Sequence, residues 1–272
     1  MIKLDRIQIS YDLKFDTPFH CGTGIREGLI DRTIVRDSEG YLYVPGSTFK
    51  GILRERCEQL ARFYEEEADV KQLIKSPHDM KIALLPGIGD VTMVTRIFGS
   101  PIYPGGLFFD DIRQTDEAKK QYDRPEKDEK GKGKYKEVQV DLYTQVRLDR
   151  PTRTTVRGAL YTSEFGVRDI IFKGSITGWL ECTAIDPSLD QCFVNVEQPD
   201  DSPTYSLLLL LAGLRLMDRL GGNKSTGKGR CKCQITHVQV NDTIYTETQW
   251  KSWLEQLEAL SYYYLSEGGS GA

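Results

Sequence analysis

The segment Leu220-Gly-Gly-Asn-Lys-Ser-Thr-Gly-Lys-Gly-Arg-Cys231 separates a strongly apolar helical pattern at 206–220 from an alternating strand pattern at 232–240. Its four glycines allow positive φ angles and close backbone approach, so the loop can turn N–H groups toward an anion. Its two lysines and one arginine add positive charge. A sugar–phosphate backbone suits such a loop, and a solvated helix-to-strand connection is the alternative.

Neither of the glycine-rich motifs with an established nucleotide mechanism fits this loop. It contains no Gly-x-x-x-x-Gly-Lys-Ser/Thr arrangement, and it follows a helix rather than the strand that a dinucleotide fingerprint needs. The prediction that this loop contacts backbone phosphates therefore depends on the conformational freedom of its glycines and on its positive charge. The candidate residues are Gly221, Gly222, Lys224, Gly227, Lys228, Gly229 and Arg230.

The composition is that of a soluble protein with one large domain or two small ones. The chain has 272 residues, a net charge of -4, and a longest apolar run (207–214) that is too short to cross a bilayer. A strand pattern begins at the N-terminus without a signal peptide, and six cysteines lack framework spacing, which favours a reducing cytoplasm. Cys231 and Cys233 could offer zinc two thiolates, but same-face strand positions explain them as well.

Hydrophobic periodicity predicts an α+β fold built on an antiparallel sheet. Apolar and polar residues alternate at 6–15 and at 171–184, which indicates two half-buried strands. Residues 32–44 are typical of a hairpin and residues 105–112 of a single strand. A further alternating segment begins at 138.

Helical spacing predicts three helices. One covers 47–67 with Ser47 as its N-cap, one covers 205–220, and one begins at 248. Residues 113–137 lack apolar periodicity and are expected to form a mobile or protruding excursion.

Basic residues recur where the chain could meet phosphates. Lys50 and Arg54 lie in the first half of the 47–67 helix, where an anion at the helix start explains a lysine better than helix stability does. A solvent-facing lysine is the alternative. An extended arm dense in arginine and threonine suits phosphate contacts and wedging against bases, or else it is a sheet edge kept soluble by charge. Its candidate residues are Arg147, Arg150, Arg153, Arg157 and Tyr161.

Four segments in this order resemble the RAMP superfamily of CRISPR systems, above all the repeated backbone subunit of type III effector complexes. They are Gly22-Thr-Gly24 through Asp31, the Tyr43-Val-Pro-Gly-Ser-Thr-Phe-Lys-Gly-Ile-Leu-Arg54 run, Phe98-Gly-Ser100 and the glycine-rich loop at 221–229. The resemblance spans most of residues 1–240.

The resemblance implies a modified ferredoxin-like, RNA-recognition-like palm with an inserted β-thumb. The palm would cover 1–245, with the thumb or insertion at about 113–165, a C-terminal helix at 246–267 and a linker-like tail at 268–272. Copies would stack along a guide RNA beside other CRISPR effector subunits, hold its backbone at Lys50, Arg54 and the glycine-rich loop, and wedge their thumbs between guide–target segments.

The resemblance also implies an endoribonuclease of antiviral defence that cuts the paired target RNA with Mg²⁺ or Mn²⁺ at Asp31, and it implies no organic cofactor. Arg32 would contact RNA beside it. RNA carries its own nucleophile, the 2′-hydroxyl, so geometry and charge neutralisation suffice for cutting. Three alternatives stay open: Asp31 as an ordinary loop-capping residue, a non-cutting structural subunit, and a metal-independent guide-processing nuclease. Of the histidines at 20, 78 and 237, only His20 lies near Asp31 in sequence.

Overall fold

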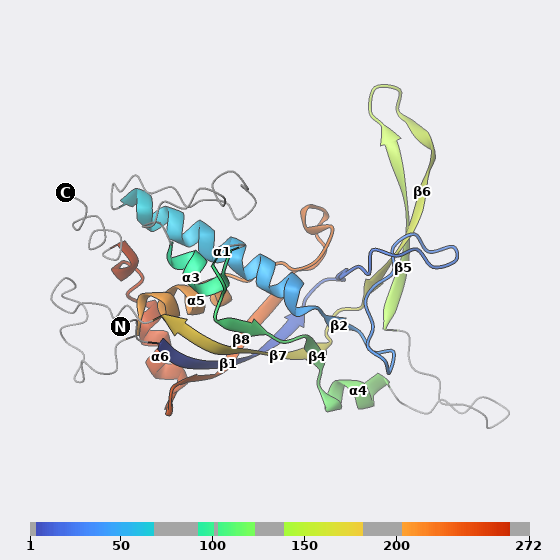
Figure 1. Cartoon of the computed structure of the whole chain (residues 1–272). Coiled ribbons are helices and arrows are strands. Elements are labelled where there is room, and N and C mark those ends of the chain that lie inside the picture. Colours follow the sequence, from blue (N-terminus) through green and yellow to red (C-terminus); the bar gives the residue numbers. More distant parts are fainter. Residues whose placement is uncertain (1–3, 68–91, 101–102, 123–138, 182–202, 262–272) are drawn as a thin grey trace.

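The computed structural model describes residues 4–67, 92–100, 103–122, 139–181 and 203–261 (Figure 1). Its base is an antiparallel sheet with the strand order β2-β4-β7-β1-β8-β9, and β3 pairs with β7 beside this path. The strands are β1 (Leu4–Phe15), β2 (Tyr43–Val44), β3 (Leu107–Phe109), β4 (Ile112–Gln114), β7 (Ile171–Glu181), β8 (Cys231–Val240) and β9 (Thr243–Tyr245). The expected antiparallel sheet containing the strands at 6–15 and 171–184 is confirmed for the described residues, and β1 and β7 are direct neighbours in it.

Helices cover one face of this sheet. Figure 1 shows α1 (Gly46–Glu67), α3 (Met93–Phe98) and α5 (Tyr205–Arg215) on the same side of it. Two further helices, α4 (Asp116–Tyr122) and α6 (Glu247–Leu254), lie toward its ends. The fold is thus mixed α+β with antiparallel sheets, as expected. In the part of the chain that the structure describes, no helix combines the length and the apolar character needed to cross a membrane.

Alternation along β1 builds the core. The odd-numbered side chains from Ile7 to Phe15 are buried, because they face the helices, whereas Leu4, Arg6 and Gln8 are exposed on the other face. Tyr11 stacks on Phe49 of α1 with ring centroids 4.6 Å apart. The side chains of α5 are buried from Tyr205 to Leu214, which explains why its sequence is apolar on every side.

A second, two-stranded sheet stands out from the body of the molecule. It consists of β5 (Val140–Asp149) and β6 (Thr154–Gly166), paired antiparallel, and we call it the projecting hairpin (Figure 1). One backbone bridge between Phe19 and Gly166 joins its base to the chain that leaves β1.

Residues 32–44 do not form the predicted hairpin. Only Arg36 and Leu42 bridge across the turn, while β2 pairs with β4 instead. The first half of the segment is held elsewhere, because Ile34 bridges to Gly22 and Arg32 bridges to Ser163 of the projecting hairpin. Period-two alternation identifies an extended segment but leaves its partner open.

The single strand predicted at 105–112 is wrong as well. It is split into β3 and β4 by Asp110 and Asp111, and the Asp111 carboxylate accepts the N–H of Gly46 at 3.0 Å. This contact also explains why Ser47 is not the N-cap of α1. The helix begins one residue earlier than expected and receives its cap from a distant side chain.

The helix predicted at 205–220 ends at Arg215. The chain then turns back along the glycine-rich loop, with Arg219 bridged to Arg230 and Leu220 donating to the carbonyl of Gly229 at 2.8 Å. The excursion predicted at 113–137 is wrong in its first part, where β4 ends and α4 forms. The rest of that excursion, the end of the 171–184 strand, and the linker-like tail at 268–272 lie outside the described residues.

Candidate functional site

A cleft of about 670 Å³ opens where the loop after β1 meets the glycine-rich loop. Asp31 and Arg32 line it together with Gly221 and Gly222, and Thr48 joins them from the first turn of α1. Tertiary structure therefore brings together two of the segments that the sequence singled out as separate candidates. Among the described residues of this lining, Asp31 is the one acidic side chain.

Asp31 fastens its loop to the projecting hairpin. Its N–H donates to the carbonyl of Thr162 at 2.9 Å, and its Oδ2 accepts the N–H of Thr162 at 2.9 Å. Its Oδ1 accepts a guanidinium N–H of Arg26. These contacts support the interpretation of Asp31 as a loop-capping residue. The side chain still retains 24% of its accessible surface, so it faces the cleft while it holds the loop.

The residues of the cleft fit a divalent ion only in a limited way. No group of three or more His, Cys, Asp or Glu side chains placed to hold a metal occurs among the described residues. Mg²⁺ is commonly held by one or two carboxylates, with water and substrate phosphate as its other ligands. Asp31 can be one such ligand if Arg26 moves away, and the Arg26 side chain is 77% exposed, so little obstructs this movement.

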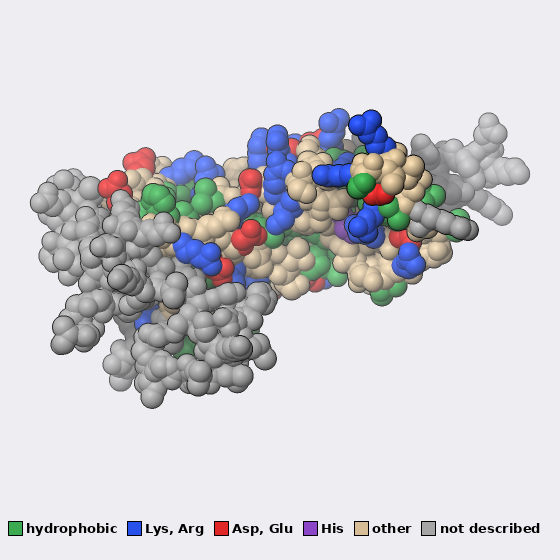
Figure 2. Space-filling view, turned by 90° about the horizontal axis from the view of Figure 1, so that it is seen from above, with side chains coloured by type: hydrophobic (Ala, Val, Ile, Leu, Met, Phe, Trp, Pro, Cys, Tyr) green, Lys and Arg blue, Asp and Glu red, His purple; other side chains and the backbone are tan. Residues whose placement is uncertain are grey.

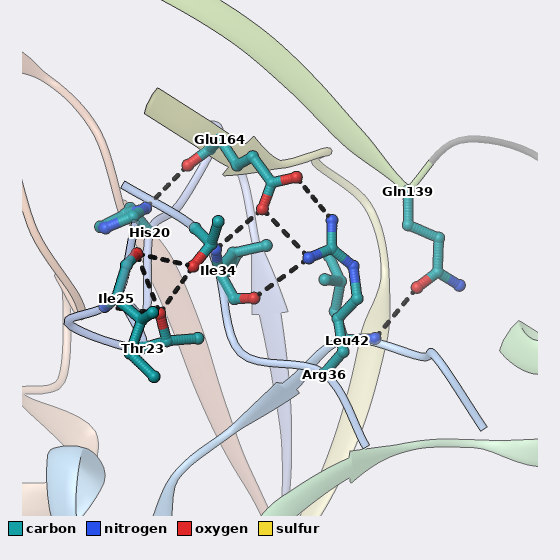
Figure 3. A network of polar contacts seen from close by, with 9 residues as sticks. His20, Thr23, Ile25, Ile34, Arg36, Leu42, Gln139 and Glu164 are labelled. Atoms are coloured by element: carbon teal, nitrogen blue, oxygen red, sulfur yellow. Dashed lines mark hydrogen bonds and ion pairs between the residues drawn. The ribbon is translucent and has the colours of Figure 1, made fainter. Parts of the chain in front are cut away.

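Glu164 of β6 joins the hairpin to the loop through its backbone and its carboxylate, and Figure 3 shows its contacts with His20, Ile34 and Arg36. Its N–H donates to the carbonyl of Arg32 at 2.9 Å, and its own carbonyl accepts a hydrogen bond from the His20 ring at 2.7 Å. Its carboxylate accepts the N–H of Ile34 at 2.9 Å and both terminal guanidinium nitrogens of Arg36. Burial raises the pKa of the Glu164 carboxyl, but the hydrogen bonds from Arg36 and Ile34 outweigh burial and leave it below its ordinary value.

His20 forms the wall of the cleft between Asp31 and the glycine-rich loop. The residue is buried, and its ring lies against Phe165 with centroids 5.5 Å apart. The expectation that His20 lies near the Asp31 loop is confirmed, since both line the cleft. His237 lies on β8, outside this lining, and residue 78 is outside the described part of the chain.

The glycine-rich loop does not direct most of its N–H groups outward. The N–H of Gly222 donates to His20, that of Gly229 donates to Pro18, and those of residues 226–228 donate within the loop itself. These five N–H groups, three of them from glycines, are therefore not free to meet an anion as the sequence predicted. Gly221 has φ 91°, and a Cβ there would lie 2.6 Å from the His20 carbonyl oxygen, so its role is close backbone packing.

Two cations of the site lie over aromatic rings of the projecting hairpin. Lys228 Nζ is 4.0 Å from the ring centroid of Tyr143 and 5.2 Å from that of Phe165. The Arg32 guanidinium carbon is 5.2 Å from the ring centroid of Tyr161. The two contacts place positive charge along the base of the hairpin, beside the cleft.

Three of the other predicted contacts on the body of the molecule, Lys50, Arg54 and Lys224, have a protein partner. Lys50 Nζ lies 5.5 Å from the Phe109 ring centroid, and burial, followed by the charge of Arg54, lowers the Lys50 pKa. Arg54 donates to Glu58 and to the carbonyl of Gly99, while Lys224 pairs with Glu55 at 3.5 Å. At the start of α1 the protein's own Asp111 accepts the N–H of Gly46. Arg230 is exposed.

The arginines of the projecting hairpin are more open. Arg147, Arg150 and Arg153 are exposed and form no ion pair within the residues that the structure describes. Figure 2, seen from above, shows Lys and Arg side chains gathered over this half of the molecule. The Arg157 backbone belongs to β6, and its side chain is outside the described part. Unpaired arginines on an extended hairpin remain free to bind phosphates.

The zinc interpretation of Cys231 and Cys233 gains no support. Both thiols are buried on the same face of β8, as the alternative interpretation expected. Burial raises the pKa of Cys231 to about 12, and it raises the pKa of Cys233 as well, which keeps both protonated.

Several residues of the site were missed from the sequence. No sequence motif or spacing marks these residues, because each acts through a partner that only folding brings close. They are Arg26, Arg36, Tyr143 and Glu164. A lone glutamate in an alternating segment is typical of a solvated strand face, yet Glu164 is 5% exposed.

Comparisons with known proteins identify the family of the chain. The model of the RAMP superfamily matches residues 12–232. The chain is 25% identical over 237 residues, which is 81% of it and 75% of the relative, to the "CRISPR system Cms endoribonuclease Csm3" of Methanocaldococcus jannaschii. A chain in the "Cryo-EM structure of the Type III-B Cmr-beta bound to cognate target RNA" matches at 13% identity with a TM-score of 0.48, covering 84% of this chain and 96% of that one. This protein therefore belongs to the RAMP superfamily, as a distant relative of Csm3.

Proposed function

We propose that this protein is a backbone subunit of a type III CRISPR effector complex, which binds guide RNA and cleaves the paired target RNA. The observation that carries the proposal is the cleft, because it unites Asp31 with the glycine-rich loop at the base of a cationic hairpin. The family assignment and the relationship to an endoribonuclease support it. The protein would act in the cytoplasm, in antiviral defence, with copies stacked along one guide beside other subunits.

In this proposal the sheet and its helices form the RNA-recognition-like, ferredoxin-like palm within residues 1–245, and the projecting hairpin is the thumb. The guide backbone would run past Arg32 and Lys228, whose positions over Tyr161 and Tyr143 keep their charge at the junction of palm and thumb. Exposed arginines farther along the hairpin, such as Arg147, would contact phosphates of the paired strands. These contacts involve the backbone, so they carry no sequence preference.

Cleavage needs an RNA strand whose 2′-hydroxyl, phosphorus and leaving 5′-oxygen lie in line. A thumb that wedges between base pairs would splay a nucleotide and supply that geometry. Two hydrogen bonds with Thr162 hold Asp31, one donated by its N–H and one accepted by its carboxylate, so the position of the carboxylate is well defined. A bound Mg²⁺ or Mn²⁺ would supply charge neutralisation at the phosphate. Asp31 would hold it there, and Arg26 would have to leave the carboxylate.

A non-cutting structural subunit is the second candidate. One observation favours it: both oxygens of Asp31 already have protein partners, Arg26 and Thr162. In this case Asp31 shapes the guide-binding loop and the complex binds its target without cutting it. A third candidate, the metal-independent nuclease, would rely on His20, which lines the same cleft.

The test uses the reconstituted complex with guide-complementary RNA. Asp31→Asn keeps an oxygen for the Thr162 N–H and removes the charge, so it is the sharper variant, with Asp31→Ala beside it. Loss of carboxylate or metal help should slow cutting by about a hundred-fold or more while assembly persists. Normal cutting by both variants would favour the structural subunit. Cutting that survives EDTA but is lost in His20→Ala would favour the metal-independent nuclease.

A further inference from the structure

The two ring nitrogens of His20 lie in different surroundings. Nδ1 is 2.7 Å from the carbonyl oxygen of Glu164, and a carbonyl oxygen only accepts, so Nδ1 carries a proton. When the ring is neutral, Nε2 is therefore an acceptor. Within the described residues it has no hydrogen-bond partner, although the residue is only 9% exposed.

Two glycines keep this acceptor open to the cleft. A Cβ at Gly22 would lie 2.7 Å from Nε2, and a Cβ at Gly222 would lie 3.4 Å from the adjacent ring carbon, Cδ2. Any larger side chain at Gly22 would cover the nitrogen. All three residues line the cleft that also contains Asp31 and Arg32.

The chemistry of the cleft selects the group that can meet Nε2. A phosphate oxygen only accepts and cannot satisfy a neutral ring nitrogen, whereas the Arg32 guanidinium, which lines the same cleft, is a donor suited to phosphate. The ribose 2′-hydroxyl is a donor attached close to the phosphate backbone, and DNA lacks it. A nucleotide with its phosphate near Arg32 and its ribose near His20 would satisfy both groups.

We propose that Nε2 of His20 accepts a hydrogen bond from a ribose 2′-hydroxyl of an RNA strand in this cleft. His20 is then a specificity-determining residue that favours RNA over DNA at one nucleotide for each copy of the protein. The inference rests on the proposed RNA binding and adds the group that is recognised. The hydroxyl belongs either to the guide or to its target.

The test measures dissociation constants, because removal of a 2′-hydroxyl at the scissile nucleotide would block cutting for chemical reasons alone. One arm scans single 2′-deoxy substitutions through the guide, bound to the full chain. The other arm scans them through a target bound to the guide-loaded complex. The arm that responds identifies the strand. Both arms are run on the wild type, on His20→Phe, which keeps an aromatic ring without an acceptor, and on His237→Phe as the matched histidine control.

In the wild type and in His237→Phe, the substitution at one nucleotide should weaken binding about tenfold, the value of one hydrogen bond to a buried acceptor. In His20→Phe the same substitution should change binding by less than about twofold, since the partner is gone. Gly22→Ala should reproduce this result, because its φ is ordinary and its methyl group would cover Nε2. This second variant decides the matter if His20→Phe does not fold.

The result that overturns the inference is equally specific. If RNA binds but no 2′-deoxy position distinguishes the wild type from both variants, His20 does not contact a ribose, and the proposed function is unaffected. If the wild type binds no RNA in either arm, the inference and the proposed function fail together.

Discussion

Arg36 and Glu164 form a two-pronged ion pair, with N···O distances of 2.8 and 3.0 Å, between the loop after β1 and the projecting hairpin. The two residues are 128 positions apart in the chain. Because Glu164 also binds Arg32, Ile34 and His20, this pair fastens the hairpin to the wall of the cleft. A change in the tilt of the projecting hairpin would therefore move the residues that line the cleft.

Glu164→Gln should destabilise this junction. The amide can still accept the Ile34 N–H, but it loses the charge that balances Arg36. The Arg36 side chain is one-third exposed, so water can partly replace its partner, and the expected loss is about 1–3 kcal/mol of unfolding free energy. Urea denaturation checks this value. The control is Glu247→Gln in the exposed pair with Lys251, which should cost clearly less, because water screens an exposed pair. Equal losses in the two variants would contradict the special role of Glu164.

Acid should weaken the same junction. The pKa of Glu164 is lowered in the folded protein, so its contribution is fully present above the unfolded carboxyl pKa of about 4.3 and is lost as the pH falls through the folded value. The difference in unfolding free energy between wild type and Glu164→Gln should shrink over this window. Denaturation curves at pH 7, 5 and 3 measure it. A difference that grows toward low pH would have the wrong sign.

The two substitutions of Asp31 should separate structure from chemistry. Asp31→Ala removes the acceptor of the Thr162 N–H and leaves that group without its partner, so it should cost about 1–2 kcal/mol more than Asp31→Asn. Both should abolish cutting if the carboxylate charge is required. Thermal unfolding and a cleavage assay on the same preparations test the two statements independently. Equal unfolding temperatures of the two variants would show that the Asp31 side chain does not hold its loop in place.

Lys228 should contribute to RNA binding without sequence preference. Lys228→Ala should weaken binding to all RNA sequences alike and reduce the slope of log K against log salt by about 0.7–0.9, the value of one phosphate contact. Titrations at several salt concentrations measure the slope. Lys251→Ala, on α6, should leave it unchanged. A loss that depends on RNA sequence would contradict a backbone contact.

Arg54 and Arg147 should differ although both are predicted RNA contacts. Arg54 is bonded to Glu58 and to the carbonyl of Gly99, whereas Arg147 is exposed. Arg54→Ala should therefore lower the unfolding free energy by about 1–2 kcal/mol, and Arg147→Ala should stay within about 0.5 kcal/mol of the wild type. Parallel unfolding and RNA-binding measurements distinguish them. Weaker RNA binding in a fully stable Arg147→Ala would identify a contact of the hairpin.

The sequence by itself determined the elements whose signal is local. Alternation at 6–15 and helical spacing at 47–67 were sufficient to place β1 and α1, because burial of one face follows from side-chain periodicity. The segments around Asp31 and around Gly221 were singled out only as separate candidates, and the fold places both in one cleft. Motif resemblance pointed to the RAMP superfamily, and the matching family model confirms that assignment.

Only the tertiary structure decided how those segments are held. Asp31 is fastened by Thr162, which is 131 residues away, and α1 is capped by Asp111 rather than by Ser47. Glycine N–H groups expected to face an anion are used inside the protein. Such contacts depend on hydrogen bonds between backbone and side chains that are distant in sequence. They produce no periodic pattern in the sequence. A single polar residue looks the same in a sequence whether it is hydrogen-bonded to water or to a buried amide.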